Sequence, residues 1–402
     1  MVASHCHAVA NGTVILPDRL IEDGMVVWSG QHITHVGRRK RLPIKTQITD
    51  AHGGLIAPGF VDLHVHGGAG SDFMDATVPD VLTACRAHLN HGTTTLFPTT
   101  TTGSHDNIQH MLDACRSARS QILRNPRLGA AIAGVHLYGP YFAEDKAGCH
   151  DKTACRSPAH DDFAAWFTSS LVRIATCAAE LPGAADFYRT AAQRRCLITC
   201  GHSNASWSEM QSAFEAGMRH VDHFWCAMSS VPSLRQRFGT PMQGSMAEFV
   251  LMNAEMSTEV IADGCHLAPE LLEFAFRMKG AHRLCLVTDC NRALDLPPGN
   301  YVFGNRQAGT PFHSDGNVGW AATGSLASAV KGMDHMVRHM AQNTSASLPD
   351  CFRMASLTPA ARSGLSKLTG SLAPGKRADI LILDQELFVQ QVFARGVDVT
   401  ST

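Results

Sequence analysis

Hydrophobic and polar positions divide the chain into two kinds of segment. In roughly the first fifty residues, short apolar runs such as TVIL, GMVVWSG and HITHVG alternate with Gly, Asp and Asn, which predicts antiparallel β structure. From about Gly370 onward, GSLAPGKRADILILD contains another apolar strand, and QQVFARGVDV ends in a further short one. We therefore expect both chain ends, residues 1–57 and 361–402, to form one small β-sandwich domain.

Residues 58–360 follow a different pattern, in which apolar runs alternate with helix-like segments. The runs include LITCG, RLCLVTD and AAIAGVHLYG, and the helix-like segments include residues 206–218 and 268–280. Repeated βα units favour a parallel sheet with helices outside, and about 300 residues suit a (β/α)8 barrel. An open doubly wound sheet is the alternative, but no Gly-x-Gly-x-x-Gly turn opens a helix.

Composition narrows the class of protein. The 402 residues are 45% hydrophobic with a net charge of −1, so the chain can bury a large core and is not attracted electrostatically to nucleic acid. No apolar run approaches the roughly eighteen residues of a membrane span, and the first residues lack the pattern of a secretory signal. We expect a cytoplasmic protein with a small-molecule substrate and neither a nucleic-acid nor a membrane partner. The 13 cysteines are scattered, odd in number and without a Cys-x-x-Cys pair, which predicts reduced thiols.

Four of the predicted strands end in residues that can bind a metal ion. GFVDLHVHGG places His64 and His66 on one side of a strand, LITCGHSNA ends in His202, HVDHFWCAM contains His223, and LCLVTDC ends near Asp289. Active sites of barrel enzymes are assembled at the C-terminal ends of the strands. We therefore expect these five side chains to form one metal site.

Each of these residues also has an ordinary structural interpretation. A single histidine at a strand end is more often a satisfied core or capping group, and Asp289 or Thr288 can cap the next helix. The occurrence of metal-binding residues at four predicted strand ends together favours the metal site. Imidazole nitrogens and a carboxylate suit one Zn²⁺, with Fe, Mn or Co as alternatives, and an incomplete protein shell leaves a position for a water that can act as hydroxide.

The same segments resemble the N-acetylglucosamine-6-phosphate deacetylase family of the amidohydrolase superfamily. The resemblance covers nearly the whole chain, through APGFVDLHVHGGAGSDFMD, HGTTTLFPTTTT, GVHLYGPYFAEDKAGCHD, GHSNAS, HVDHFWCAM, ADGCHLAPE, LVTDC and LAPGKRADILILD. It implies a (β/α)8 barrel with a β-sandwich built from both chain ends. It further implies a homodimer that hydrolyses the acetamide of a phosphorylated amino sugar.

The resemblance also implies roles for the metal-site residues. His202 and His223 match the family's two metal-binding histidines, and Asp289 matches its catalytic aspartate. His64 and His66 match a His-x-His pair that only some members carry.

Further roles outside the metal shell follow from the same resemblance. His150 matches a histidine that contacts the sugar and polarises the acetamide carbonyl. Arg237 and His266 match groups that bind phosphate and sugar, although without the resemblance each would be interpreted as a surface or helix-start residue. Cys226 and Ala227 occupy the place of a family Asn-Ala pair at the phosphate end, so phosphate recognition is only partly retained.

Tyr138 is the largest departure from the family, which has a glutamate metal ligand at this position. A neutral phenol is a poor substitute for a carboxylate. Either the metal ion shifts toward His64 and His66, with His202 and Asp289 completing the shell, or metal binding is weak and catalysis is lost. The presence of the His-x-His pair favours the first hypothesis.

In the favoured hypothesis, Asp289 accepts a proton from the attacking water and returns it to the leaving nitrogen. His223 is either a ligand or a neighbour that orients water. His150 and Tyr138 would donate hydrogen bonds to the developing oxyanion, while the alternative for Tyr138 is a hydroxyl that only satisfies a backbone carbonyl. Two other functions stay open: hydrolysis of another N-acyl substrate or deamination, and a sugar-phosphate-binding barrel that has lost its metal.

Overall fold

A closed barrel of parallel strands forms the centre of the molecule. The computed structural model describes residues 6–43, 45–168 and 170–400. The barrel strands within this described part are β6 (Phe60–Val65), β9 (Thr93–Pro98), β11 (Val135–Leu137), β12 (Val172–Thr176), β13 (Leu197–Cys200), β14 (His220–Val221), β15 (Ser257–Val260) and β16 (Leu284–Leu286).

Two short connections complete the ring of strands. A parallel bridge between Thr99 and His136 joins β9 to β11, and the Asp289 backbone N–H donates to the His64 carbonyl at 2.8 Å, which joins the end of β16 to β6. The short strand β10 (Ala131–Ile132) pairs with β9. The predicted (β/α)8 fold is confirmed.

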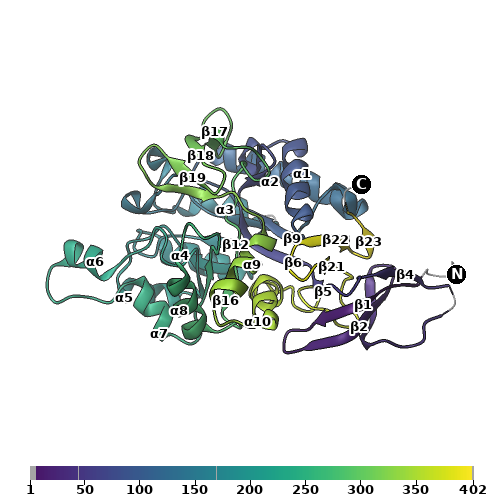
Figure 1. Ribbon diagram of the computed structural model, residues 1–402. Helices are drawn as coiled ribbons and strands as arrows, with labels where there is room; N and C mark the ends of the chain where they lie inside the picture. The colour runs from purple at the N-terminus through teal and green to yellow at the C-terminus, as the bar shows by residue number, and fades with distance from the viewer. Residues whose placement is uncertain (1–5, 44, 169, 401–402) are drawn as a thin grey trace.

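Helices surround the barrel and supply much of its core (Figure 1). The helices predicted at 206–218 and 268–280 are present as α5 (Trp207–Glu215) and α8 (Pro269–Lys279). The α-helices are α1 (Val78–Asn90), α2 (His105–Arg124), α3 (His160–Thr168), α4 (Ala184–Gln193), α5 (Trp207–Glu215), α6 (Val231–Phe238), α7 (Met246–Met252), α8 (Pro269–Lys279), α9 (Met333–Asn343), α10 (Leu348–Phe352) and α11 (Thr358–Arg362). A π-helical turn spans Arg353–Leu357, and 3-10 turns span Phe73–Asp75, Pro126–Leu128, Glu144–Lys146 and Lys152–Ala154.

Strands from both chain ends form one sheet beside the barrel (Figure 1). Its strands are β1 (Cys6–Ile15), β2 (Leu20–Ser29), β3 (His32–Arg38), β4 (Gln47–Asp50), β5 (Leu55–Pro58), β21 (Ile380–Leu383), β22 (Val389–Ala394) and β23 (Val397–Asp398). Successive residues of β1 enter different clusters, since Val9 packs with Trp28 on one face and Ala8 with Met25 on the other. Apolar side chains therefore pack on both faces of the sheet at β1 and β2, while the domain boundaries at 57/58 and 360/361 stay a prediction.

A four-stranded antiparallel sheet between β16 and α9 was not predicted. Its strands are β17 (Gly299–Phe303), β18 (Thr310–Ser314), β19 (Val318–Ala321) and β20 (Leu326–Ala329). Phe303 and Phe312 pack with Cys149, so the sheet supports the loop that carries His150. Asp315-Gly316, between β18 and β19, is the turn signal that could have revealed a hairpin. A small hairpin of β7 (Gly67–Gly68) and β8 (Ser71–Asp72) follows β6.

Two further features bear on the class of protein. None of the helices in the described ranges combines the length and the apolar composition that a bilayer-crossing helix needs. All 13 cysteines are free in the structure, and the reduced state of their thiols stays a prediction.

Arg395 links the small β domain to the barrel. Its guanidinium donates to the carbonyls of Leu123, at 2.9 Å, and of Ile122, at the C-terminal end of α2, and its backbone N–H donates to Asp379. Hydrogen bonds from a charged donor contribute about 1.5–3 kcal/mol each, so we expect Arg395→Ala to lower the free energy of unfolding by about 2 kcal/mol. Urea denaturation measures this change. Arg124→Ala, an exposed change on the same helix, should stay within about 0.5 kcal/mol, and equal losses in both variants would contradict the assignment.

Candidate metal centre and catalytic pocket

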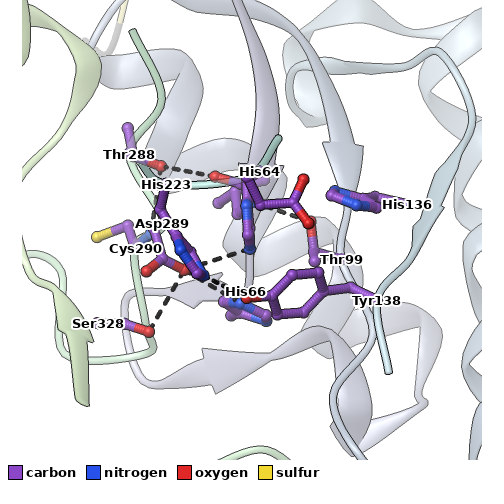
Figure 2. A network of polar contacts seen from close by, with 12 residues as sticks. His64, His66, Thr99, His136, Tyr138, His223, Thr288, Asp289, Cys290 and Ser328 are labelled. Atoms are coloured by element: carbon purple, nitrogen blue, oxygen red, sulfur yellow. Dashed lines mark hydrogen bonds and ion pairs between the residues drawn. The ribbon is translucent and has the colours of Figure 1, made fainter. Parts of the chain in front are cut away.

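His64, His66 and Asp289 converge where β6 meets the end of β16. The two histidines alternate along β6, so both side chains point to the same side, and both are almost fully buried. His66 Nε2 lies 3.1 Å and His64 Nε2 lies 3.5 Å from Asp289 Oδ1 (Figure 2). One potential ligand atom from each residue lies within 4.8 Å of the other two, and we call these three residues the metal group.

These three residues fit the divalent ion that the sequence predicts. The buried Nε2 of His64 has no hydrogen-bond partner, although buried polar atoms are rarely left unpaired. Two imidazoles and one carboxylate are donors that zinc and similar first-row ions prefer, and three protein ligands leave a position open. A metal ion bound by these three residues would give the unpaired nitrogen a partner.

Four residues at the site have a strained backbone. Asp289 (φ 46°), His202 (φ 47°), Ala227 (φ 48°) and Ser328 (φ 64°) all adopt the left-handed conformation that side chains other than glycine rarely accept. Such residues cost about 1–3 kcal/mol each and cluster at functional sites. The Ser328 hydroxyl lies 3.4 Å from Asp289 Oδ1, so two of the strained residues contact each other directly.

Asp289 is ionised at neutral pH. Burial alone would raise the pKa of this carboxyl, but the positive charge of His64 and the hydrogen bond from His66 outweigh burial and hold the pKa well below its usual range. Burial also disfavours the charged form of His64, yet Glu259 and Asp289 raise the pKa of His64 to about 9. The carboxylate is therefore available as a ligand and as a proton acceptor.

His202 and His223 adjoin this group without belonging to it. The ring centroid of His223 lies 5.4 Å from that of His64 and 5.1 Å from that of His202. His202 Nδ1 lies 2.6 Å from the Lys146 carbonyl and donates to it, which leaves Nε2 with its lone pair, as a ligand requires. The structure thus gathers all five predicted ligands, and the ligand role of His202 and His223 stays a prediction.

The Tyr138 hydroxyl forms a very short hydrogen bond with His223 Nε2 (Figure 2). The tyrosine is buried, and its ring centroid lies 4.4 Å from that of His64. Burial raises the pKa of Tyr138 well above its ordinary value, so the phenol is neutral. Its partner is a histidine rather than a backbone carbonyl, and its role toward the substrate stays a prediction.

A cavity of about 400 Å³ opens beside the metal group. Its lining includes the predicted residues His150, Cys226, Ala227 and His266 together with Tyr138, His202, His223 and Asp289. A larger cavity of about 840 Å³ adjoins it and shares Asp145 and Lys146 with it. The smaller cavity is the one lined by Asp289 and by four of the predicted site histidines, so we regard it as the catalytic pocket.

Two of the histidines that line the pocket, His150 and His266, differ in charge. The Thr102 backbone N–H faces His150 Nδ1 at 3.5 Å, so Nε2 carries the proton of the neutral ring. Burial, reinforced by His202, lowers the pKa of His150 well below its ordinary value. His266 Nδ1 lies 2.7 Å from Asp263 Oδ2, and this contact raises the pKa of His266 against the effect of burial. His150 is thus a neutral donor, while His266 favours the cation.

Arg237 is placed away from the other predicted residues. It lies on α6, lines the larger cavity, and forms a two-pronged ion pair with Glu209 at 2.7 and 2.8 Å. A third bond, to the Asn204 carbonyl at 2.9 Å, also holds the guanidinium. Within one chain, Arg237 therefore does not face the catalytic pocket.

Sequence reasoning missed several residues that the structure places at or behind the site, among them Glu259, Lys152 and Ser328. Glu259 lies in β15, where a charged residue in a buried strand is itself a signal, because an unpaired buried carboxylate is strongly disfavoured. Lys152, two residues after His150, lines the pocket. Ser328 comes from the unpredicted sheet, so no signal pointed to it.

Comparison with known proteins agrees with this geometry. The model of the amidohydrolase family matches residues 55–400. The chain belongs to the amidohydrolase family. An N-acetylgalactosamine-6-phosphate deacetylase of Escherichia coli O157:H7 is 32% identical over 88% of this chain and 90% of its own length. An N-acetylglucosamine-6-phosphate deacetylase of Bacillus subtilis (strain 168) is 29% identical over 95% of this chain and 94% of its own length.

A solved structure agrees as well. A variant of N-acetyl-D-glucosamine-6-phosphate deacetylase from Mycobacterium smegmatis, in complex with N-acetyl-D-glucosamine-6-phosphate, superimposes with a TM-score of 0.87. It is 25% identical, and the match covers 99% of this chain and 100% of that one. This amidohydrolase is therefore a hydrolytic enzyme, and its family implies a divalent metal ion.

The geometry predicts which histidines hold that ion. In His66→Asn, one of the three converging ligands is lost, so the zinc content after reconstitution should fall from near one equivalent to below roughly 0.2. Elemental analysis of the purified protein measures it. His150→Asn, which changes a pocket histidine outside the group, should keep its zinc. A His66→Asn protein that retains zinc while His202→Asn loses it would move the metal site to the other histidines.

Proposed function

We propose that this amidohydrolase removes the acetyl group from an N-acetylated amino sugar 6-phosphate, releasing acetate and the free amine. The observation that carries the proposal is the convergence of His64, His66 and Asp289 beside a pocket large enough for a sugar. The deacetylase names of its relatives support the same substrate class.

Asp289 provides both proton transfers of the reaction. Its ionised carboxylate accepts a proton from the water that attacks the amide carbon, and the protonated form then donates to the amide nitrogen as the carbon–nitrogen bond breaks. His64, His66 and Asp289 would hold the divalent ion, which we propose is a single Zn²⁺. Such an ion would polarise the carbonyl and lower the pKa of the attacking water.

His150 and Tyr138 act on the carbonyl oxygen. The neutral His150 ring keeps its proton on Nε2 and can donate it to the oxygen as negative charge develops there. Tyr138 is also neutral and can contribute its hydroxyl once the substrate competes with His223 for it. A donor preorganised in this way contributes a few kcal/mol to stabilising the transition state.

Positive charge near the pocket supports a phosphorylated substrate. Lys146 and Lys152 line it, together with His266, and neither lysine forms an ion pair in the described part of the chain. Arg237 is instead paired with Glu209. Cys226 has no charge to offer to a phosphate, because burial raises the pKa of its thiol to about 12.

A homodimer and a cytoplasmic location are also part of the proposal. The segment containing α6 projects from the body of the molecule (Figure 1), and Phe238 and Met242, at and beyond its end, are 42% and 69% exposed. An exposed apolar arm of this kind supports contact with a second copy of the chain. Such a contact could also turn the Arg237 side chain away from Glu209.

Substrate screening tests the proposed reaction. The zinc-loaded protein should release amine and acetate from N-acetylglucosamine-6-phosphate or N-acetylgalactosamine-6-phosphate. Asp289→Asn should lower kcat by about 10³-fold, since it removes the proton acceptor, with little change in the melting temperature. The exposed Asp161→Asn should leave kcat unchanged. Acetate-free release of ammonia would support a deaminase instead, and no turnover of any N-acetylated sugar would overturn the proposal.

A second comparison tests how the phosphate is recognised. In Lys152→Ala, the KM for the phosphorylated sugar should rise about tenfold, equivalent to about 1.4 kcal/mol, while KM for the unphosphorylated sugar stays the same. Steady-state kinetics on the two substrates measure the ratio. If Arg237→Ala raises this KM and Lys152→Ala does not, the phosphate is bound by the arginine after a rearrangement of its ion pair.

A further inference from the structure

Glu259 places a carboxylate directly behind the metal group. It lies in β15, and its side chain is only 1% exposed. Oε1 lies 2.6 Å from His64 Nδ1 and also accepts the backbone N–H of His223 at 3.2 Å. Oε2 lies 3.4 Å from His220 Nε2. One carboxylate therefore contacts two strand ends that carry predicted metal ligands.

These contacts fix which nitrogen of His64 faces the site. A carboxylate 2.6 Å from Nδ1 requires a proton on that nitrogen. An ion would take the place of the second proton that His64 carries in its cationic form, so Nε2 would offer its lone pair to the ion. This is the atom that lies 3.5 Å from Asp289 Oδ1 without a hydrogen-bond partner. The ring cannot easily turn, because the rings of Tyr138 and His136 pack against it with centroids at 4.4 and 5.0 Å.

We propose that Glu259 is the positioning residue for His64: it holds the Nδ1–H form of the ring and aims Nε2 at the metal group. Outer carboxylates that accept the second N–H of a metal-binding histidine fix its orientation and make it a stronger donor. The inference rests on the proposed metal site of His64, His66 and Asp289. It adds a residue that touches neither substrate nor ion.

The same carboxylate also belongs to a second group that could hold a metal ion, with His64 and Asp222. Hydrogen bonds account for that group without an ion. Asp222 accepts the Thr176 hydroxyl at 2.8 Å and a shorter bond from the Thr199 hydroxyl, while Glu259 is occupied by the contacts above. Glu259 therefore acts through His64 rather than as a ligand of a separate ion.

Cobalt binding tests the assignment. Glu259→Gln keeps the length and an accepting oxygen but removes the charge, so the affinity of the chelator-treated full chain for Co²⁺ should fall about 10–100-fold. The absorption bands of bound Co²⁺ should shift as His64 becomes a weaker donor. Glu180→Gln is the matched control, since Glu180 also accepts two hydrogen bonds, from Ser203 and Asn204, at a position away from His64.

Three outcomes separate the possibilities. If Glu259→Gln binds Co²⁺ within twofold of the unchanged protein, or loses no more affinity than Glu180→Gln, the positioning role is overturned. If the unchanged protein itself binds no Co²⁺, the proposed metal site fails before Glu259 is tested. A melting temperature equal to that of the control, with weakened Co²⁺ binding, separates positioning from a general loss of stability.

A measurement on the unchanged protein covers the case in which Glu259→Gln does not fold. In the zinc-loaded protein with ¹⁵N-labelled histidine, the His64 signals, assigned by their absence in His64→Gln, should show a proton on Nδ1 and none on Nε2. A proton on Nε2 would overturn the inference, because that nitrogen could then not face the ion.

Discussion

The hydrogen bond from the Asp289 backbone to the His64 carbonyl, at 2.8 Å, is the contact on which the site depends. It closes the barrel by joining the strand end that carries the aspartate to the strand that carries the His-x-His pair. These residues are far apart in the chain and meet only when all strands between them have formed. The metal group is therefore a product of barrel closure rather than of any local motif.

Two buried carboxylates lie where β6 meets the end of β16, and different partners stabilise them. Asp62 lies two residues before His64 on β6. Its carboxylate accepts hydrogen bonds from the Thr288 hydroxyl at 2.5 Å and from the His64 backbone N–H at 3.2 Å. Burial raises the pKa of this carboxyl to about 7. Asp289, at the pocket end, keeps its charge because two imidazoles face it. Hydroxyl hydrogen bonds thus satisfy the structural carboxylate Asp62, whereas imidazoles keep the charge of the pocket carboxylate Asp289.

The sequence could predict the parts of the site that depend on strand alternation. His64 and His66 share a face because successive side chains of a strand alternate, and Asp289 follows an apolar run that had to be a buried strand. Arg237 could not be placed in this way, since its direction is decided by an ion pair with Glu209 on another helix. The sheet of β17 to β20 was missed because its strands are only four or five residues long and because β17 and β18 are partly exposed, so their pattern resembles that of loops.

Tyr138 supports our proposal that this pocket holds one ion rather than two. The resemblance puts a glutamate ligand at this position, but a neutral phenol that is bonded to His223 supplies no charge to offset a second cation. Of the carboxylates that line the pocket, Asp145 is engaged by the Asn204 amide at 2.8 Å, which leaves Asp289 to balance the ion. In the proposed arrangement, the charge of one divalent ion would be balanced by Asp289 in the pocket and by Glu259, which lies 2.6 Å behind His64. The loss of the glutamate is therefore consistent with the proposed hydrolase, whose metal lies at the His-x-His pair.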